Sequence, residues 1–236
     1  MLERLEDGIL TLTINRPERR NAVDGPTADL LRNAVRSVRD DASCRAIVLD
    51  GAGPSFCSGW DIKAIAGLRG LDAAEVEQSF DRNRELLEDL ESAPQATIAS
   101  VHGAVMGFGL GLVASCDIAV AAESAVVALP EIGLGVVPAL VMVDLFERLP
   151  EKTALDWLLS GDRRTASQAL AAGLFSRVVA DADLGTEVGA LAATIAGHDP
   201  AAIRETKRLY RSLRALGHDE AVRTAIAAAA AALVRE

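Results

Sequence analysis

The segment His102-Gly103-Ala104-Val105-Met106-Gly107-Phe108-Gly109-Leu110-Gly111 contains four glycines between a strand-like and a helix-like run. The apolar run Ala96–Val101 before it predicts a strand, and Leu110–Ser115 predicts a helix that continues from it. A similar segment, Ser55-Phe56-Cys57-Ser58-Gly59-Trp60-Asp61-Ile62-Lys63, follows a strand predicted over Arg45–Asp50. Two backbone N–H groups converging on one carbonyl oxygen would form an oxyanion hole, which stabilises charge that develops during a reaction. The two segments therefore predict an enzyme.

Strands and helices alternate along the first half of the chain. The pattern predicts further strands over Ile9–Asn15, Ile118–Ala122 and Ala125–Leu129, and helices over Pro26–Asp41 and Ala73–Glu91. From Val141 onward the pattern is mostly helical and ends in the alanine-rich segment Ala221–Leu233. We expect an α/β core followed by a helical C-terminal part, with the alanine run Ala227–Ala232 packed closely, for instance against a partner subunit.

Composition excludes several classes of protein. The chain has 236 residues, 50% of them hydrophobic, and a net charge of −10, which argues against a nucleic-acid surface. Apolar stretches are interrupted well before the roughly 20 residues that span a membrane, and the first seven residues form no apolar signal core. We expect a cytoplasmic protein with neither nucleic acid nor a membrane as partner.

Cysteines and histidines are few and scattered. Cys44, Cys57 and Cys116 lack a C-x-x-C spacing, and the three histidines stand far apart, so we expect reduced thiols and no metal site. Cys57 lies beside a glycine turn and could be a nucleophile. A small packed residue is the favoured interpretation, because no histidine or asparagine partner is near it in the sequence.

The glycine segment allows two other interpretations. A turn from strand to helix that requires positive φ explains Gly107 equally well. Gly107 and Gly109 also suggest a dinucleotide-binding fingerprint, but the third glycine falls at Gly111 instead of residue 112, so that pattern is not met.

Glu131 is one carboxylate within the apolar stretch Leu129–Gly135. It is either a surface turn residue or a general base whose pKa is raised by burial. Two other acids in apolar settings, Asp61 and Asp117, closely follow turn residues. We expect them to cap helices or to fix loops.

Four motif blocks together resemble the enoyl-CoA hydratase/isomerase (crotonase) superfamily. The resemblance runs from about Leu10 to Arg211, and its blocks are Asn15–Ala22, Phe56–Lys63, Gly103–Asp117 and Pro130–Gly135. It implies a spiral of ββα units over residues 1–195, with a helical trimerisation region over residues 196–236 that is shorter than usual for the family. A homotrimer or a dimer of trimers is implied, with an acyl-CoA thioester as substrate and no separate cofactor.

The resemblance also assigns roles to residues. The oxyanion donors would be the backbone N–H groups of Trp60 and Phe108. Coenzyme A would be contacted by the same two residues together with Asp61, Ile62, Lys63 and Arg20, and the last two would lie near the phosphates.

The catalytic carboxylates carry the prediction of activity. Hydratases of this family use two glutamates, and only one has a counterpart here, Glu131; the second position is Gly111. Hydration needs two groups, whereas one base can move a proton from C2 to C4. The resemblance therefore favours a Δ3,Δ2-enoyl-CoA isomerase, with a hydratase or other crotonase-type lyase, or a non-catalytic acyl-CoA-binding protein, as alternatives. A glutamate introduced at position 111 is expected to face the thioester and to add some hydratase activity.

Overall fold

The computed structural model describes residues 1–234 and is built on a six-stranded sheet with the strand order β1-β2-β3-β4-β6-β9. β1 is antiparallel to β2, and the other neighbouring pairs are parallel. The strands are β1 (Leu2–Glu6), β2 (Ile9–Ile14), β3 (Ala46–Gly51), β4 (Ala96–Val101), β6 (Ile118–Ala122) and β9 (Arg177–Val179). A three-stranded sheet, ordered β5-β7-β8, consists of β5 (Ala104–Met106), β7 (Val126–Ala128) and β8 (Arg164–Thr165).

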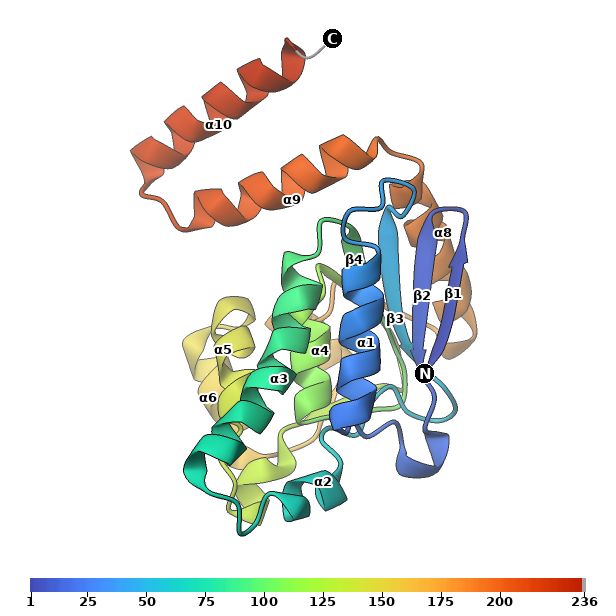
Figure 1. Cartoon of the computed structure of the whole chain (residues 1–236), viewed down its shortest axis with the longest axis vertical. Helices are drawn as coiled ribbons and strands as arrows, with labels where there is room; N and C mark the ends of the chain where they lie inside the picture. Colours follow the sequence, from blue (N-terminus) through green and yellow to red (C-terminus); the bar gives the residue numbers. More distant parts are fainter. Residues whose placement is uncertain (235–236) are drawn as a thin grey trace.

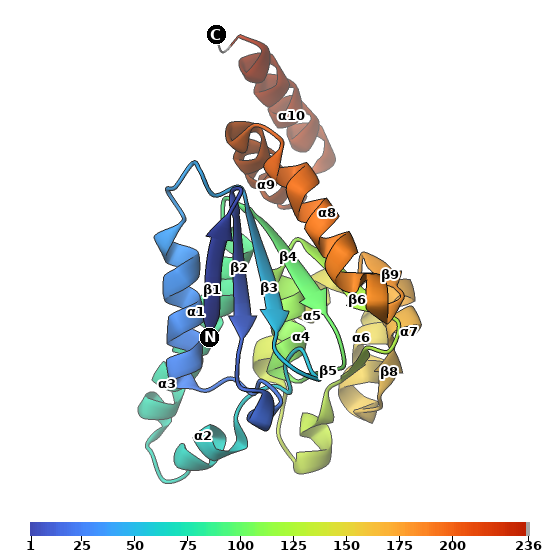
Figure 2. The ribbon, with the colours of Figure 1, turned by 90° about the vertical axis from the view of Figure 1, so that its right-hand side faces the viewer.

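Helices cover both faces of the larger sheet, as Figures 1 and 2 show. The α-helices are α1 (Gly25–Ser37), α2 (Ile62–Gly67), α3 (Ala73–Ser92), α4 (Phe108–Ser115), α5 (Ala139–Arg148), α6 (Glu151–Ser160), α7 (Ala166–Ala172), α8 (Leu184–Ala196), α9 (Pro200–Arg214) and α10 (His218–Leu233). Short 3₁₀ helices are η1 (Pro17–Arg19), η2 (Pro130–Leu134) and η3 (Asp181–Asp183).

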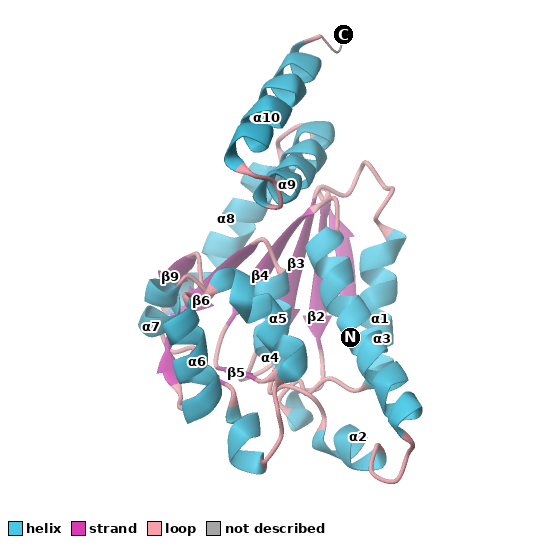
Figure 3. Ribbon diagram, turned by 90° about the vertical axis from the view of Figure 1, so that its left-hand side faces the viewer, coloured by secondary structure: helices cyan, strands magenta, loops and turns pink. Residues whose placement is uncertain are grey.

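The core lies on two sides of the sheet. On β3, Ile47 and Leu49 belong to the larger core, which α1, α3 and α4 also line, whereas Val48 faces the smaller core under α8. Figure 3 shows α1, α3, α4 and α5 on one side of the strands. Parallel strands buried on both faces lack a polar face, which explains why β3 and β4 are continuous apolar runs in the sequence.

Helix α4 is central to the fold, because all eight of its residues are buried. It packs against α3, α5 and β5. A Cβ on Gly109 would lie 2.7 Å from the Cys57 carbonyl oxygen, so a glycine is required where the helix meets the first glycine segment. Glycine in the segment His102–Gly111 thus allows two backbone segments to approach each other closely.

The predicted α/β core is confirmed, and the predicted strand over Ile118–Ala122 is matched residue for residue. Helix α1 ends at Ser37 instead of Asp41. The Gln95 side chain donates a hydrogen bond to the Val38 carbonyl oxygen (2.5 Å), which satisfies a group that would otherwise continue the helix. The sequence did not predict β1, because its five residues are exposed and show no alternation.

Helices α9 and α10 extend from the rest of the molecule and have no buried residue (Figure 1). Polar contacts fix α9 to the core. Lys207 donates to the Gln95 carbonyl oxygen (2.5 Å) and pairs with Asp117, and Arg211 reaches the other Asp117 oxygen at 3.3 Å. No helix within residues 1–234 is long and apolar enough to cross a membrane.

The expectation that Asp117 fixes a loop is confirmed. Its Oδ2 accepts hydrogen bonds from the Thr97 N–H (2.8 Å) and hydroxyl (3.0 Å) in addition to the contacts with α9. One carboxylate, just before β6, thus joins the start of β4 to α9.

We predict that Asp117→Ala lowers the free energy of unfolding by about 3–5 kcal/mol, because it leaves the largely buried Lys207 ammonium without its counter-charge. Denaturant unfolding followed by circular dichroism measures the loss. Asp156→Ala is the control, since Asp156 forms an exposed pair with Arg164 and should cost at most about 1 kcal/mol. Equal losses in the two variants would contradict the role given to Asp117.

Candidate active site

The two glycine segments lie side by side at the carboxyl ends of β3 and β4. Isolated β-bridges join Ser55 to Gly103 and Cys57 to Val105. The Met106 N–H donates to the Cys57 carbonyl oxygen at 2.9 Å. The sequence therefore brings together the two segments that it marks with glycines.

Hydrogen bonds to Val23 orient the peptide groups around Trp60. The Val23 N–H donates to the Gly59 carbonyl oxygen (2.9 Å), and the Asp61 N–H donates to the Val23 carbonyl oxygen (2.7 Å). Because N–H groups of successive residues in an extended chain point to opposite sides, the Trp60 N–H faces away from Val23. That donor is left available for another acceptor.

The second donor is close to the first segment. A Cβ on Gly59, which has a φ of 95°, would lie 3.5 Å from the Phe108 nitrogen and 2.8 Å from the Met106 carbonyl oxygen. Phe108 is the first residue of α4, so its N–H has no partner inside the helix and lies at the positive end of the helix dipole. The Trp60 and Phe108 rings meet edge to face, with centroids 5.2 Å apart.

The Glu131 carboxylate lies against the N-terminus of α4. Gly107 precedes α4 with a φ of 51°, and a Cβ there would overlap Glu131 Oε1. Glu131 Oε2 is buried and has no hydrogen-bond partner among the described residues. Burial raises the pKa of Glu131, and the hydrogen bond from its own backbone N–H offsets only part of this shift. The sequence left open whether Glu131 is a surface turn residue or a buried carboxylate with a raised pKa. The structure supports the buried carboxylate.

Side chains from two neighbouring helices border Gly111. A Cβ at this position would lie 3.2 Å from Leu87 Cδ1 on α3 and 3.7 Å from Asp144 Oδ2 on α5. Leu87 is fully buried. A glutamate side chain at position 111 would therefore contact Leu87 and Asp144 on two neighbouring helices, and these contacts bear on the expectation that it faces the thioester.

A polar network that the sequence did not reveal holds the first segment in place. The Asn21 side chain is buried and donates to the carbonyl oxygens of Ala52 (2.8 Å) and Ser55 (2.7 Å). Arg16 pairs with Asp24 at 2.9 Å and with Asp61 at 3.2 Å. Arg16 and Asn21 both lie within the motif block Asn15–Ala22. Their spacing in the sequence does not show which carbonyl or carboxylate groups they contact.

The residues predicted to contact coenzyme A lie around the same segment. Asp61 caps α2 by accepting a hydrogen bond from the Lys63 N–H (2.9 Å), as expected. Ile62 is 76% exposed, and Lys63 and Arg20 are exposed as well. The Arg20 carbonyl oxygen accepts a hydrogen bond from the Ser58 N–H (2.9 Å), so this arginine lies beside the first glycine segment.

Cys57 does not behave as a nucleophile. Its side chain is fully buried, and burial raises the pKa of its thiol to about 12. A thiol that stays protonated near neutral pH and is closed to solvent is a packed residue, as the favoured interpretation held.

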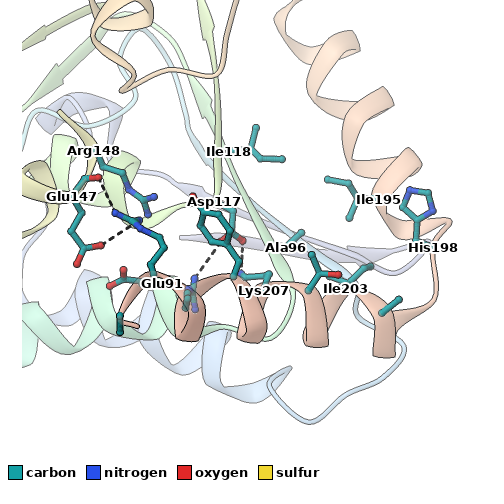
Figure 4. A pocket seen from close by; sticks show the side chains of 16 residues that line it. Glu91, Ala96, Asp117, Ile118, Glu147, Arg148, Ile195, His198, Ile203 and Lys207 are labelled. Atoms are coloured by element: carbon teal, nitrogen blue, oxygen red, sulfur yellow. Dashed lines mark hydrogen bonds and ion pairs between the residues drawn. The ribbon is translucent and has the colours of Figure 1, made fainter. Parts of the chain in front are cut away.

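A cavity of about 820 Å³ lies elsewhere, between α9 and the core. Figure 4 shows Asp117, Lys207 and Arg148 among its lining side chains, together with Ala96 and Ile118. Ala96 and Ile118 begin β4 and β6, so this cavity is at the opposite end of the sheet from the glycine segments. Its charged groups include Asp117, Lys207 and Arg211, which attach α9 to the core.

Comparisons with known proteins agree with this geometry. Residues 4–229 match the family model described as enoyl-CoA hydratase/isomerase. A putative enoyl-CoA hydratase of Thermus thermophilus is 34% identical over 228 residues, which cover 97% of this chain and 89% of the relative. A carnitinyl-CoA dehydratase of Proteus mirabilis is 32% identical over 221 residues, which cover 90% of this chain and 80% of that protein.

Solved structures have the same fold. An enoyl-CoA hydratase of Mycobacterium smegmatis has a TM-score of 0.93 and 31% identity, with coverage of 99% of this chain and 90% of that one. Pseudomonas aeruginosa AtuE has a TM-score of 0.94 and 34% identity, with coverage of 100% and 92%. The fold is therefore that of the crotonases, and the chain belongs to the enoyl-CoA hydratase/isomerase family.

Proposed function

We propose that the protein is an enoyl-CoA isomerase that shifts the double bond of a 3-enoyl-CoA to the 2-position. The observation that carries this proposal is the position of Glu131, whose carboxylate lies against Gly107, next to the Phe108 N–H. No carboxylate stands at residue 111. One carboxylate beside an oxyanion hole is the minimum that a double-bond shift requires.

The proposed reaction begins with binding of the thioester oxygen by the N–H groups of Trp60 and Phe108. Glu131 removes a proton from C2, and the resulting dienolate places negative charge on the thioester oxygen, where the two donors and the α4 dipole stabilise it. The raised pKa of Glu131 makes it a stronger base than an exposed glutamate. A proton added at C4 then completes the shift, and Glu131 can return the one that it removed.

Substrate binding is proposed to use the surface around α2. Trp60, Asp61, Ile62, Lys63 and Phe108 would contact the coenzyme A portion, with Arg20 and Lys63 supplying positive charge for its phosphates. The exposure of Ile62, Lys63 and Arg20 supports this assignment.

We also propose that the protein assembles as a homotrimer or a dimer of trimers. Apolar side chains on α10 are exposed in the single chain, among them Val222 (44%), Ile226 (65%) and Leu233 (89%). Phe146 on α5 and Leu159 on α6 are exposed as well. Apolar surface of this kind is typical of contact regions between subunits. The cytoplasm is the proposed compartment, since Cys44, Cys57 and Cys116 are unpaired.

Hydration of a 2-enoyl-CoA is the second candidate, and the names of the relatives favour it. Turnover of 3-hexenoyl-CoA and of crotonyl-CoA, measured beside the binding of both, separates isomerase, hydratase and a non-catalytic binding protein. The proposal requires that the first substrate be converted faster than the second.

We predict that Glu131→Gln keeps the fold and the affinity for acyl-CoA but lowers turnover by about 10²–10⁴-fold, the usual contribution of a positioned base. Steady-state kinetics with 3-hexenoyl-CoA measures the effect, and a calorimetric titration checks binding. Glu123→Gln, an exposed substitution outside the site, is the control. A near-normal kcat in Glu131→Gln would remove Glu131 from the mechanism.

The Phe108 donor is tested by two substitutions. Phe108→Pro removes the N–H at the first helical position, where proline is tolerated, and should lower kcat by about 10²-fold or more. Phe108→Ala removes the same ring but keeps the donor, so it should retain most of the activity. Circular dichroism verifies that both variants fold. Equal activity of the two folded variants would show that this N–H is not a donor to the substrate.

We predict that Gly111→Glu destabilises the protein and adds no hydratase activity. The new side chain would meet Leu87 and place a second carboxylate beside Asp144, and burial of like charges costs several kcal/mol. Gly111→Ala is the control and should change the free energy of unfolding by no more than about 1 kcal/mol. A stable Gly111→Glu variant that hydrates crotonyl-CoA faster than the parent would contradict this packing argument.

A further inference from the structure

The Asp144 carboxylate lies beside α4, close to where a second catalytic carboxylate would be expected. Its Oδ2 is 3.7 Å from the Cβ position of residue 111, although Asp144 belongs to α5. The Asp144 side chain is 5% exposed, and its Oδ2 has no hydrogen-bond partner within the described part of the chain. A buried carboxylate oxygen without a partner is costly, which indicates that a further group meets it in the working protein.

Arg84 orients Asp144 without fully neutralising it. Arg84 Nη1 lies 2.7 Å from Asp144 Oδ1, which leaves Oδ2 as the oxygen near Gly111. The same guanidinium also pairs with Glu88 (3.1 Å) and Glu91 (3.9 Å), so three carboxylates share one positive charge. Burial raises the pKa of Asp144 in spite of Arg84, so its carboxyl group is more readily protonated than that of an exposed aspartate.

The Asp144 carboxylate lies where C3 and C4 of a bound acyl chain are expected. Gly111 follows Phe108 by three residues, which is a rise of about 4.5 Å along α4. An acyl chain whose thioester oxygen is held by the Phe108 N–H, and which runs along α4, brings C3 and C4 toward Gly111. Leu87 provides an apolar contact at the same place.

We infer that Asp144 is the second proton-transfer residue of the active site. The inference rests on the proposed function and extends it. Glu131 takes the proton from C2, the electron pair of that C–H bond forms the C1–C2 double bond of the dienolate, and the carbonyl pair moves to the thioester oxygen. When the carbonyl re-forms, the C1–C2 pair moves to form the C2–C3 double bond. The electron pair of the former C3–C4 double bond forms a new C–H bond at C4 with the proton of the Asp144 carboxyl group. Afterwards Glu131 releases one proton to solvent and Asp144 regains one, which restores both groups.

The test separates the two proton transfers in the full-length protein. Deuterium exchange at C2 of butanoyl-CoA in D₂O needs only Glu131 and the oxyanion hole, whereas isomerisation of 3-hexenoyl-CoA needs a proton donor at C4. Asp144→Asn should lower isomerisation by about 10²–10⁴-fold and leave exchange within about threefold of the parent rate. Glu88→Gln is the control, because it removes a different carboxylate from Arg84, one that is exposed, and should change neither rate.

Two outcomes with Asp144→Asn overturn the inference. One is an unchanged rate of isomerisation. The other is an equal loss of the isomerisation and exchange rates, which would show that Asp144 has a structural role. A single turnover of the unmodified enzyme in D₂O gives evidence that is independent of the variant's folding. Solvent deuterium at C4 supports a separate donor, whereas transfer of the C2 hydrogen to C4 overturns it. An unmodified enzyme that exchanges but does not isomerise contradicts the proposed function, and with it this inference, before any substitution is made.

Discussion

The backbone hydrogen bonds that hold the first glycine segment between Val23 and Met106 are the constraint on which the site depends. The Val23 N–H donates to the Gly59 carbonyl oxygen, and the Val23 carbonyl oxygen accepts from the Asp61 N–H. The Met106 N–H donates to the Cys57 carbonyl oxygen. These bonds pair the Gly59 carbonyl oxygen and the Asp61 N–H on either side of Trp60, and the Trp60 N–H is left on the other side. Because a donor prepared in this way needs no rearrangement during a reaction, its effect on developing charge is large.

The second donor depends on burial. A helix of eight residues such as α4 is not stable in isolation, so the N–H at its start is oriented only because the whole helix is packed inside the protein. That packing requires glycine where α4 approaches Cys57 and where Glu131 reaches Gly107. The same glycines that identify the segment in the sequence are therefore the ones that allow a carboxylate and a donor to share one end of a helix.

Much of this arrangement could be predicted from the sequence, and the unpredicted part has a physical cause. Apolar runs and glycine spacing predict β3, β4, α4 and both donor segments, because those signals are local. The contacts of position 111 with Leu87 and Asp144 are not local, because the three residues belong to three different helices. No periodicity in the sequence shows which side chains of α3 and α5 meet α4. The same holds for Gln95, which ends α1 from a distant position, and for Asn21, whose partners lie more than thirty residues away.

The carboxylates around α4 differ in how completely they are paired, and this difference distinguishes the supporting residue Asp117 from the two residues proposed to transfer protons. Asp117, at the far end of the helix, accepts hydrogen bonds from Thr97 and ion pairs from Lys207 and Arg211 on both of its oxygens. Glu131 and Asp144 each keep one buried oxygen without a hydrogen-bond partner among residues 1–234. A fully paired carboxylate adds stability, whereas an incompletely paired buried one lowers stability, and burial raises the pKa of both Glu131 and Asp144. Both incompletely paired carboxylates lie beside the first half of α4, at the N-cap Gly107 and at Gly111, so the energetic cost of their burial falls near the Phe108 N–H.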